Sequence, residues 1–146
     1  MDNIIVPEFG DTHQTDGVVK PRRNRQSAKK AGTLFESQVA NFLAFRLADD
    51  RIERRAKTGA KDRGDISGVR TIRGARVVIE AKNVARQDLP GWLREAAVEA
   101  ANDDAPHGVV VHKRAGNANP AEQYVTMTLE TLVWLLLGGP DEPRGV

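Results

Sequence analysis

The sequence predicts an α/β fold in which helices flank a mixed central β-sheet, in the order α-β-β-β-α-β-β-α. Apolar residues recur at helical spacing in residues 33–48, 88–102 and 129–137. Turn-forming glycines and prolines separate these segments from shorter, strand-like stretches. The expected strands are residues 51–56, the two arms of a hairpin within 65–82, and residues 108–113 and 124–128.

The first expected helix begins at Thr33, an N-cap residue followed three positions later by Glu36, as in a capping box. It runs to about Ala48. Glu36 borders the apolar stripe of this helix, so two interpretations stay open. It either faces the sheet or only stabilises the helix N-terminus. Residues 1–31 are basic, without sustained periodicity, and are expected to be a flexible arm that either contacts nucleic acid or is a plain leader.

The expected hairpin turns at Arg73-Gly74 and would return Asp65 beside Glu80. Side chains alternate along a strand, so Glu80 and Lys82 share one face with Val78. The other face carries the apolar residues Val77, Ile79 and Ala81. Two carboxylates and a lysine are therefore expected to converge at the end of a strand.

Such a convergence is costly, because neighbouring carboxylates resist joint ionisation and buried ones lose their hydration. A hard divalent cation such as Mg²⁺ relieves both problems through oxygen ligands. Lys82 would then orient an activated water or stabilise negative charge on a phosphate.

The second helix is expected to start after the N-cap Asp88, with Pro90 in its first turn, and to end near Asn102. The residues of this helix that are expected to face the core are Leu89, Leu93, Ala96, Ala97 and Ala100. A neighbouring row of the helix holds Trp92, Glu95, Glu99 and Asn102. Glu95 is either an outer group of the metal site or, as we favour, a solvated glutamate. A buried strand follows, and its His112 is expected to be a hydrogen-bonded core residue rather than a general base.

The composition fits one folded domain with tails. The chain has 146 residues, 40% hydrophobic and 29% charged, and no cysteine, which excludes disulfides, thiolate zinc sites and cysteine nucleophiles. No signal peptide or membrane span is recognisable, so no membrane partner and a cytoplasmic location are expected.

Residues 51–82 hold ten Lys/Arg against four Asp/Glu. This basic stretch suits a polyanionic substrate, with a solvated face as the alternative.

Gly64-Asp65-Ile66 and Glu80-Ala81-Lys82 together resemble the PD-(D/E)xK nuclease superfamily, although no proline precedes Asp65. The likeness spans roughly residues 33–137 and is nearest to Holliday-junction resolvases of the archaeal and bacteriophage type. It rests also on Gly32–Glu36, Thr58–Asp65 and Val109–Arg114. It implies a restriction-endonuclease-like sandwich over residues 32–138, between the arm and a loose tail at 139–146. It also favours the sheet-facing interpretation of Glu36.

The resemblance implies a metal-dependent DNA endonuclease that resolves four-way junctions, in the bacterial host cytoplasm if the gene is from a phage. The implied catalytic residues are Glu36, Asp65, Glu80 and Lys82. The implied Mg²⁺ or Mn²⁺ ligands are Glu36, Asp65, Glu80 and the Ala81 carbonyl. Candidate DNA contacts are Lys61, Arg63, Lys113 and Arg114. The alternatives are another PD-(D/E)xK nuclease of repair, flap or restriction type, or a non-catalytic basic DNA-binding protein with a structural Asp65–Glu80–Lys82 salt-bridge cluster.

A homodimer is expected, because a four-way junction has two-fold related strands and one chain carries one such site. The last expected helix, residues 129–137, is apolar nearly all round, whereas covering a small domain requires only one stripe. We expect a dimer contact here that includes Trp134. The alternatives are that this helix is simply buried, or that its second face meets the N-terminal arm.

Overall fold

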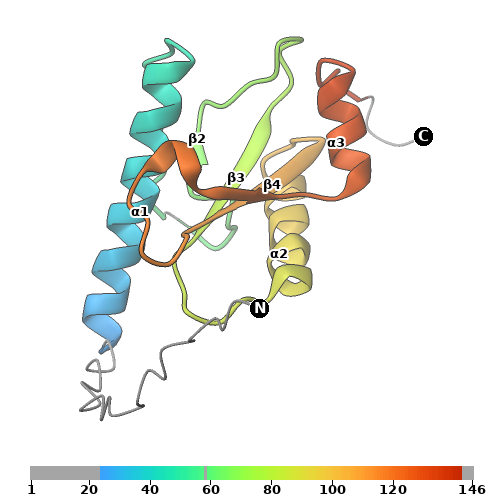
Figure 1. Cartoon of the computed structure of the whole chain (residues 1–146). Helices are drawn as coiled ribbons and strands as arrows, with labels where there is room; N and C mark the ends of the chain where they lie inside the picture. Colours follow the sequence, from blue (N-terminus) through green and yellow to red (C-terminus); the bar gives the residue numbers. More distant parts are fainter. Residues whose placement is uncertain (1–23, 58, 143–146) are drawn as a thin grey trace, which may run out of the picture.

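The computed structural model describes residues 24–57 and 59–142 and has an α/β architecture built on a five-stranded mixed sheet (Figure 1). The order of helices and strands is the predicted one, with a short 3₁₀ helix, η1, added before the last strand. The elements are α1 (Arg25–Arg46), β1 (Glu53–Arg54), β2 (Ile66–Ser67), β3 (Val77–Lys82), α2 (Leu89–Asn102), β4 (His107–His112), η1 (Pro120–Glu122), β5 (Tyr124–Thr126) and α3 (Leu129–Leu136).

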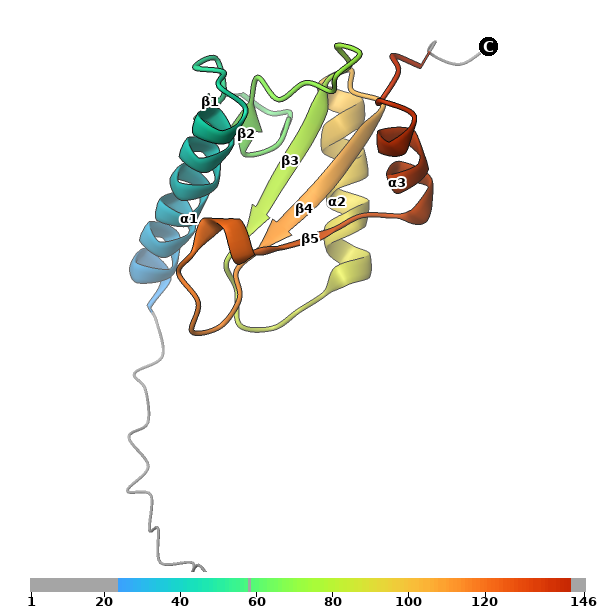
Figure 2. The same ribbon diagram turned by 45° about the horizontal axis from the view of Figure 1, so that its top comes forward.

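The sheet has the spatial order β1-β2-β3-β4-β5. Only β3 and β4 are parallel, because α2 forms the crossover between them, and the other neighbouring strands are antiparallel. Helices α1 and α2 cover opposite faces of the sheet (Figure 2). The central strands are therefore shielded on both sides.

The alternation predicted for β3 is confirmed. Val77, Ile79 and Ala81 pack into the cluster that holds Phe35 and Val39 of α1. The remaining side chains of β3, which include the Glu80 carboxylate, lie on the α2 side. The period of two thus separates an apolar face from a face that carries charge.

Helix α1 begins earlier than predicted. Asn24 is its N-cap, and the Asn24 side chain accepts a hydrogen bond of 2.8 Å from the backbone N–H of Ser27. Thr33 lies inside the helix, where its carbonyl accepts a bond from Ser37 Oγ, so the predicted N-cap and capping box are wrong. Residues 25–32 contain good helix formers but no large apolar residue, so periodicity could not reveal this first part. The remainder of the predicted arm, residues 1–23, lies outside the described residues.

Helix α2 has the predicted ends, with the Asp88 side chain accepting from the backbone N–H of Gly91. The predicted core row is only partly right. Ala97 is exposed, whereas Trp92 and Glu99 are buried. Alanines on several sides of the helix define no clear stripe, so the large Trp92 ring, packed with Val110, determines the buried face.

The segment after α3 is packed as far as Pro140, rather than loose from residue 139. Thr71 Oγ1 donates a 2.5 Å hydrogen bond to the carbonyl of Gly139, and Trp134 Nε1 donates one of 2.6 Å to the carbonyl of Pro140. Trp134 is only 2% exposed. Trp134 is therefore a core residue, and our expectation that it forms a dimer contact is wrong.

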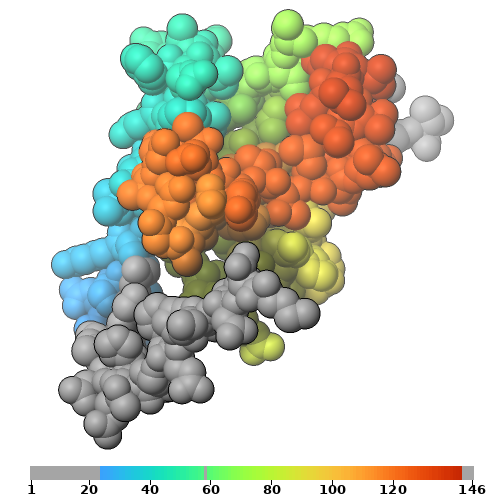
Figure 3. Space-filling model, in the orientation of Figure 1, coloured from blue at the N-terminus to red at the C-terminus, as the bar shows by residue number. Residues whose placement is uncertain are grey.

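The opposite side of α3 is exposed and apolar. The exposed large apolar residues of α3 and its C-cap are Leu129, Leu132, Val133, Leu136 and Leu137. We call them the α3 face. In the space-filling view, α3 is a surface element beside the tip of the β2–β3 hairpin, where Arg73 donates its backbone N–H to Gly138 (Figure 3). Within residues 24–57 and 59–142, no helix combines the length and the apolar character needed to cross a membrane.

Candidate functional site

Asp65 immediately precedes β2, and the hairpin places it beside β3, as predicted. Gly64 has a φ of +90°, and a Cβ atom there would lie 2.8 Å from Val78 Cγ1, so only glycine permits this close approach. The Asp65 backbone N–H donates to the Ile79 carbonyl at 2.9 Å, and the Asp65 Oδ2 atom accepts from the Ala81 N–H at 2.9 Å. The buried Asp65 carboxylate is thus held against the Glu80-Ala81 peptide.

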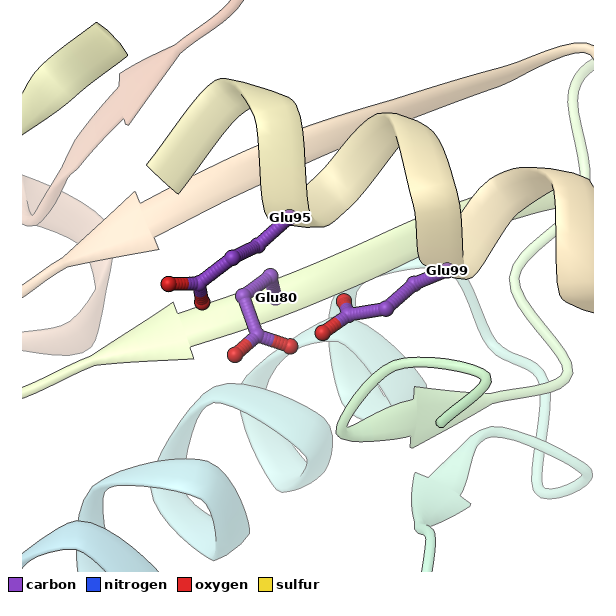
Figure 4. A group of neighbouring side chains, drawn as sticks. All are labelled: Glu80, Glu95 and Glu99. Atoms are coloured by element: carbon purple, nitrogen blue, oxygen red, sulfur yellow. The ribbon is translucent and has the colours of Figure 1, made fainter. Parts of the chain in front are cut away.

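Glu80 extends from β3 toward α2, where it meets two glutamates that are one helical turn apart. Figure 4 shows Glu95 and Glu99 projecting from α2 toward Glu80. One carboxylate oxygen from each of the three residues lies within 4.8 Å of the others. We call these residues the glutamate cluster.

Lys82 lies at the edge of the glutamate cluster. Its Nζ atom is 3.2 Å from Glu80 Oε1 and 2.5 Å from Glu95 Oε2. Partial burial acts to lower the pKa of Lys82, but the bonds and charges of these carboxylates outweigh it and raise that pKa. Lys82 is therefore held as an ammonium ion, and Glu95 is more than the solvated helix glutamate that we favoured from the sequence.

Glu99 is a site residue that the sequence interpretation missed. It is 4% exposed, and neither its Oε2 atom nor Glu80 Oε2 has a hydrogen-bond partner within the described part of the chain. Burial raises the pKa of both carboxyl groups, and the Asp65 charge acts in the same direction on each. The two groups are close enough to share one proton. When both are ionised, their inner oxygens need a cation. The only signal in the sequence was the spacing of Glu95 and Glu99 at i and i+4.

Glu36 faces the sheet, which decides between the two interpretations of this residue. Its Oε2 atom accepts a hydrogen bond of 2.9 Å from Arg54 Nε of β1, and its side chain is 15% exposed. Burial raises the pKa of Glu36, and the charge of Asp65 raises it further. Asp65 is therefore within electrostatic reach of Glu36 on one side and Glu80 on the other.

The predicted ligands are brought together in part. The Asp65 charge acts on both Glu36 and Glu80, but among the described residues only Glu80 of the three belongs to the glutamate cluster. The Ala81 N–H points to Asp65, and the N–H and C=O of one strand residue point to the same side. The Ala81 carbonyl consequently faces the Asp65 side of β3, where it can bind the same metal ion as Asp65.

A basic pocket of about 810 Å³ lies beside the site, between residues 55–57 and 59–64 on one side and the β2–β3 hairpin on the other. Its cationic lining residues are Arg55, Lys57, Lys61, Arg63, Arg70 and Arg76. Lys61 and Arg63 are exposed, as suits phosphate contacts. Gly64 also lines the pocket, so the basic surface reaches the residue that precedes Asp65.

The other two predicted DNA contacts are engaged within the protein. Lys113 Nζ donates to the carbonyls of Arg114 and Asn117. The Arg114 guanidinium lies over the Tyr124 ring at 4.7 Å and donates to the Glu122 carbonyl. Both residues therefore hold the loop before β5. His112 is buried and its Nε2 atom is 2.8 Å from Thr126 Oγ1, which agrees with the expected hydrogen-bonded core histidine.

Comparison of this chain with known protein families, with curated proteins and with solved structures finds no match in any of the three. Function is therefore inferred from the geometry of the site and from the residue pattern.

Proposed function

We propose that this protein is a metal-dependent DNA endonuclease of the PD-(D/E)xK type. The observation that carries the proposal is the hydrogen bond from the Ala81 N–H to Asp65, which holds one carboxylate beside the strand that bears Glu80 and Lys82. The element order and the mixed sheet between helices are compatible with a restriction-endonuclease-like sandwich. The four-way-junction substrate rests on the sequence resemblance alone.

The side chains of the site fit a hard divalent cation. The donors are oxygens, and Glu80 Oε2 is a buried acceptor without a partner among the described residues. Glu36, Asp65, Glu80 and the Ala81 carbonyl would hold Mg²⁺ or Mn²⁺. When bound, the cation supplies Lewis-acid neutralisation of phosphate charge and a water of lowered pKa.

The side chains of the protein then have separable roles. Asp65 and Glu80 would bind and orient the cation, because β2 and β3 hold their carboxylates in place. The Lys82 ammonium lies beside Glu80, where it would stabilise the negative charge that develops on a scissile phosphate. Lys61 and Arg63 would contact the backbone of DNA that enters by the basic pocket.

A structural salt-bridge cluster in a non-catalytic DNA-binding protein is the competing interpretation. The ion pairs of Lys82 with Glu80 and Glu95 favour it. The unpartnered inner oxygens of Glu80 and Glu99 oppose it, because a cluster selected for stability alone would satisfy buried acceptors.

Cleavage assays test the proposal directly. Synthetic four-way junction, flap, linear duplex and single-stranded DNA are incubated side by side with Mg²⁺, with Mn²⁺ or with EDTA. We expect metal-dependent cleavage that EDTA abolishes, with the junction cut fastest. Cleavage of flap or duplex DNA in preference to the junction would support one of the other PD-(D/E)xK activities. Binding of DNA without cleavage of any substrate would support the non-catalytic alternative.

We also propose that the chain forms a homodimer through the α3 face. Leu129 and Leu136 are 76% and 77% exposed, which leaves apolar surface that a second copy would bury. Two sites in one C₂ dimer would match the paired strands of a junction. Light scattering should give twice the chain mass of 16.0 kDa.

Leu136→Glu tests this contact, because it places a charge on the α3 face without touching the core. It should yield a monomer that nicks the junction once instead of making paired incisions. Val98→Glu is the matched control, since Val98 is an exposed apolar residue of α2, and it should stay dimeric. A wild-type mass near 16 kDa that junction DNA leaves unchanged would contradict both the dimer and the paired cut.

A further inference from the structure

The glutamate cluster contains two acids that the proposed nuclease site does not use. Glu95 and Glu99 project from successive turns of α2 toward Glu80, which the nuclease site already includes (Figure 4). These acids come from the helix that follows β3, on the side opposite α1 and Glu36. Glu80 is therefore common to two groups of oxygen atoms.

With all of its carboxyl groups ionised, the cluster carries a net negative charge. Glu80, Glu95 and Glu99 contribute −3 when ionised and Lys82 contributes +1, so their sum is −2. Asp65 adds further negative potential, because its charge acts on both Glu80 and Glu99. One divalent cation would offset the charge of the cluster.

The unpartnered oxygens point to the same conclusion independently of the charge. Glu80 and Glu99 are 5% and 4% exposed, and the Oε2 atom of each is buried without a hydrogen-bond donor among the described residues. Buried acceptors of this kind are rare in folded proteins unless water, an ion or a proton satisfies them. Lys82 occupies Glu80 Oε1 and Glu95 Oε2, so it does not satisfy the inner pair.

We propose that Glu80 and Glu99, completed by Glu95, bind a second divalent cation, with Glu80 shared between this subsite and the Glu36–Asp65 side of the centre. Its catalytic use rests on the proposed function, but its binding does not. The third donor is a carboxylate oxygen of Glu95, which lies within 4.8 Å of an oxygen of each of the other two residues. Three carboxylates suit Mg²⁺ or Mn²⁺, which prefer oxygen ligands, and two cations at one centre would stabilise both the attacking and the leaving oxygen of a phosphate.

Calorimetric titration of the DNA-free protein with Mn²⁺ tests the subsite without relying on activity. Wild type should bind one more ion per chain than Glu99→Gln. If the count is equal, Glu99→Gln should bind one ion more weakly by at least the roughly 10- to 100-fold that changes around metal ligands produce. Asp65→Asn should retain the ion that Glu99→Gln loses. Glu130→Gln, an exposed glutamate of α3, is the matched control and should titrate like wild type.

One titration result would exclude the second cation subsite. If Glu99→Gln binds Mn²⁺ with the stoichiometry and affinity of wild type, the inner oxygens share a proton and the subsite does not exist. Glutamine nearly preserves the shape of the buried side chain, and circular dichroism checks its fold. Should Glu99→Gln fail to fold, Glu95→Gln decides instead, because the Glu95 side chain is 53% exposed and its change should weaken the same ion.

The cleavage assay separates this proposal from the proposed function. If wild type cuts none of the DNA substrates and Glu99→Gln still loses an ion, the nuclease assignment fails and the subsite stands. If wild type cuts DNA and Glu99→Gln binds Mn²⁺ normally, the subsite fails and the nuclease stands.

Discussion

Asp65→Asn and Glu80→Gln should each abolish DNA cleavage and leave junction binding intact. Both changes remove the negative charge of a proposed ligand while nearly preserving its shape. In Asp65→Asn the amide oxygen can still accept the Ala81 N–H, so the hairpin should keep its place. Binding should be unchanged or tighter, because one source of repulsion from phosphate is gone. Single-turnover cleavage and electrophoretic mobility of a labelled junction measure the two effects separately.

Asp62→Asn is the matched control for Asp65→Asn. Asp62 lies on the same loop, is exposed, and accepts the Gly64 N–H through an oxygen that asparagine also offers. This variant should cleave like wild type. Mn²⁺ should raise the melting temperature of wild type more than that of Asp65→Asn, because a ligand that binds only the native state stabilises it by mass action. Wild-type turnover in Asp65→Asn or Glu80→Gln would exclude the proposed centre.

Lys82→Ala should lower the cleavage rate by a factor of order 10²–10³, as expected for the loss of one preorganised electrostatic partner at a transition state. The fall should appear in the single-turnover rate more than in junction affinity, because Lys82 lies at the carboxylates and not in the basic pocket. Folding should be nearly unchanged. The Glu95 partner is half exposed, so its ion pair with Lys82 contributes little, and Glu80 can take up a proton once the ammonium is removed.

A purely structural Lys82 predicts the reverse pattern. Thermal unfolding would then show a large loss of stability in Lys82→Ala, while the folded fraction would cut DNA at the wild-type rate. Rates are therefore compared at equal folded fraction and at one Mg²⁺ concentration. A folded Lys82→Ala protein with normal turnover would remove this lysine from the mechanism.

Much of the fold is encoded in local patterns and could be predicted from the sequence. The alternation along β3 placed Glu80 and Lys82 on one face, because a strand turns successive side chains to opposite sides whatever surrounds it. The Asp88 cap and Pro90 marked the start of α2, since capping depends on a few adjacent residues. The turn near Gly74 returned Asp65 to β3 for the same reason.

Other features depended on which elements pack together. Helical periodicity leaves the rotation of α2 about its axis undetermined when alanines occupy several sides, so Glu99 could not be assigned to the site from the sequence. The loop contacts of Lys113 and Arg114 likewise depend on a turn that no local pattern specifies.

The sequence by itself determined the order of elements, the face shared by Glu80 and Lys82, and the meeting of Asp65 with β3. Tertiary structure alone decided that Glu36 faces the sheet, that Trp134 is buried, and that α2 brings Glu95 and Glu99 to Glu80. The physical reason is the distance along the chain over which each kind of interaction acts. Backbone periodicity and capping act within a few residues, whereas the partner of each face depends on the packing of segments far apart in the chain.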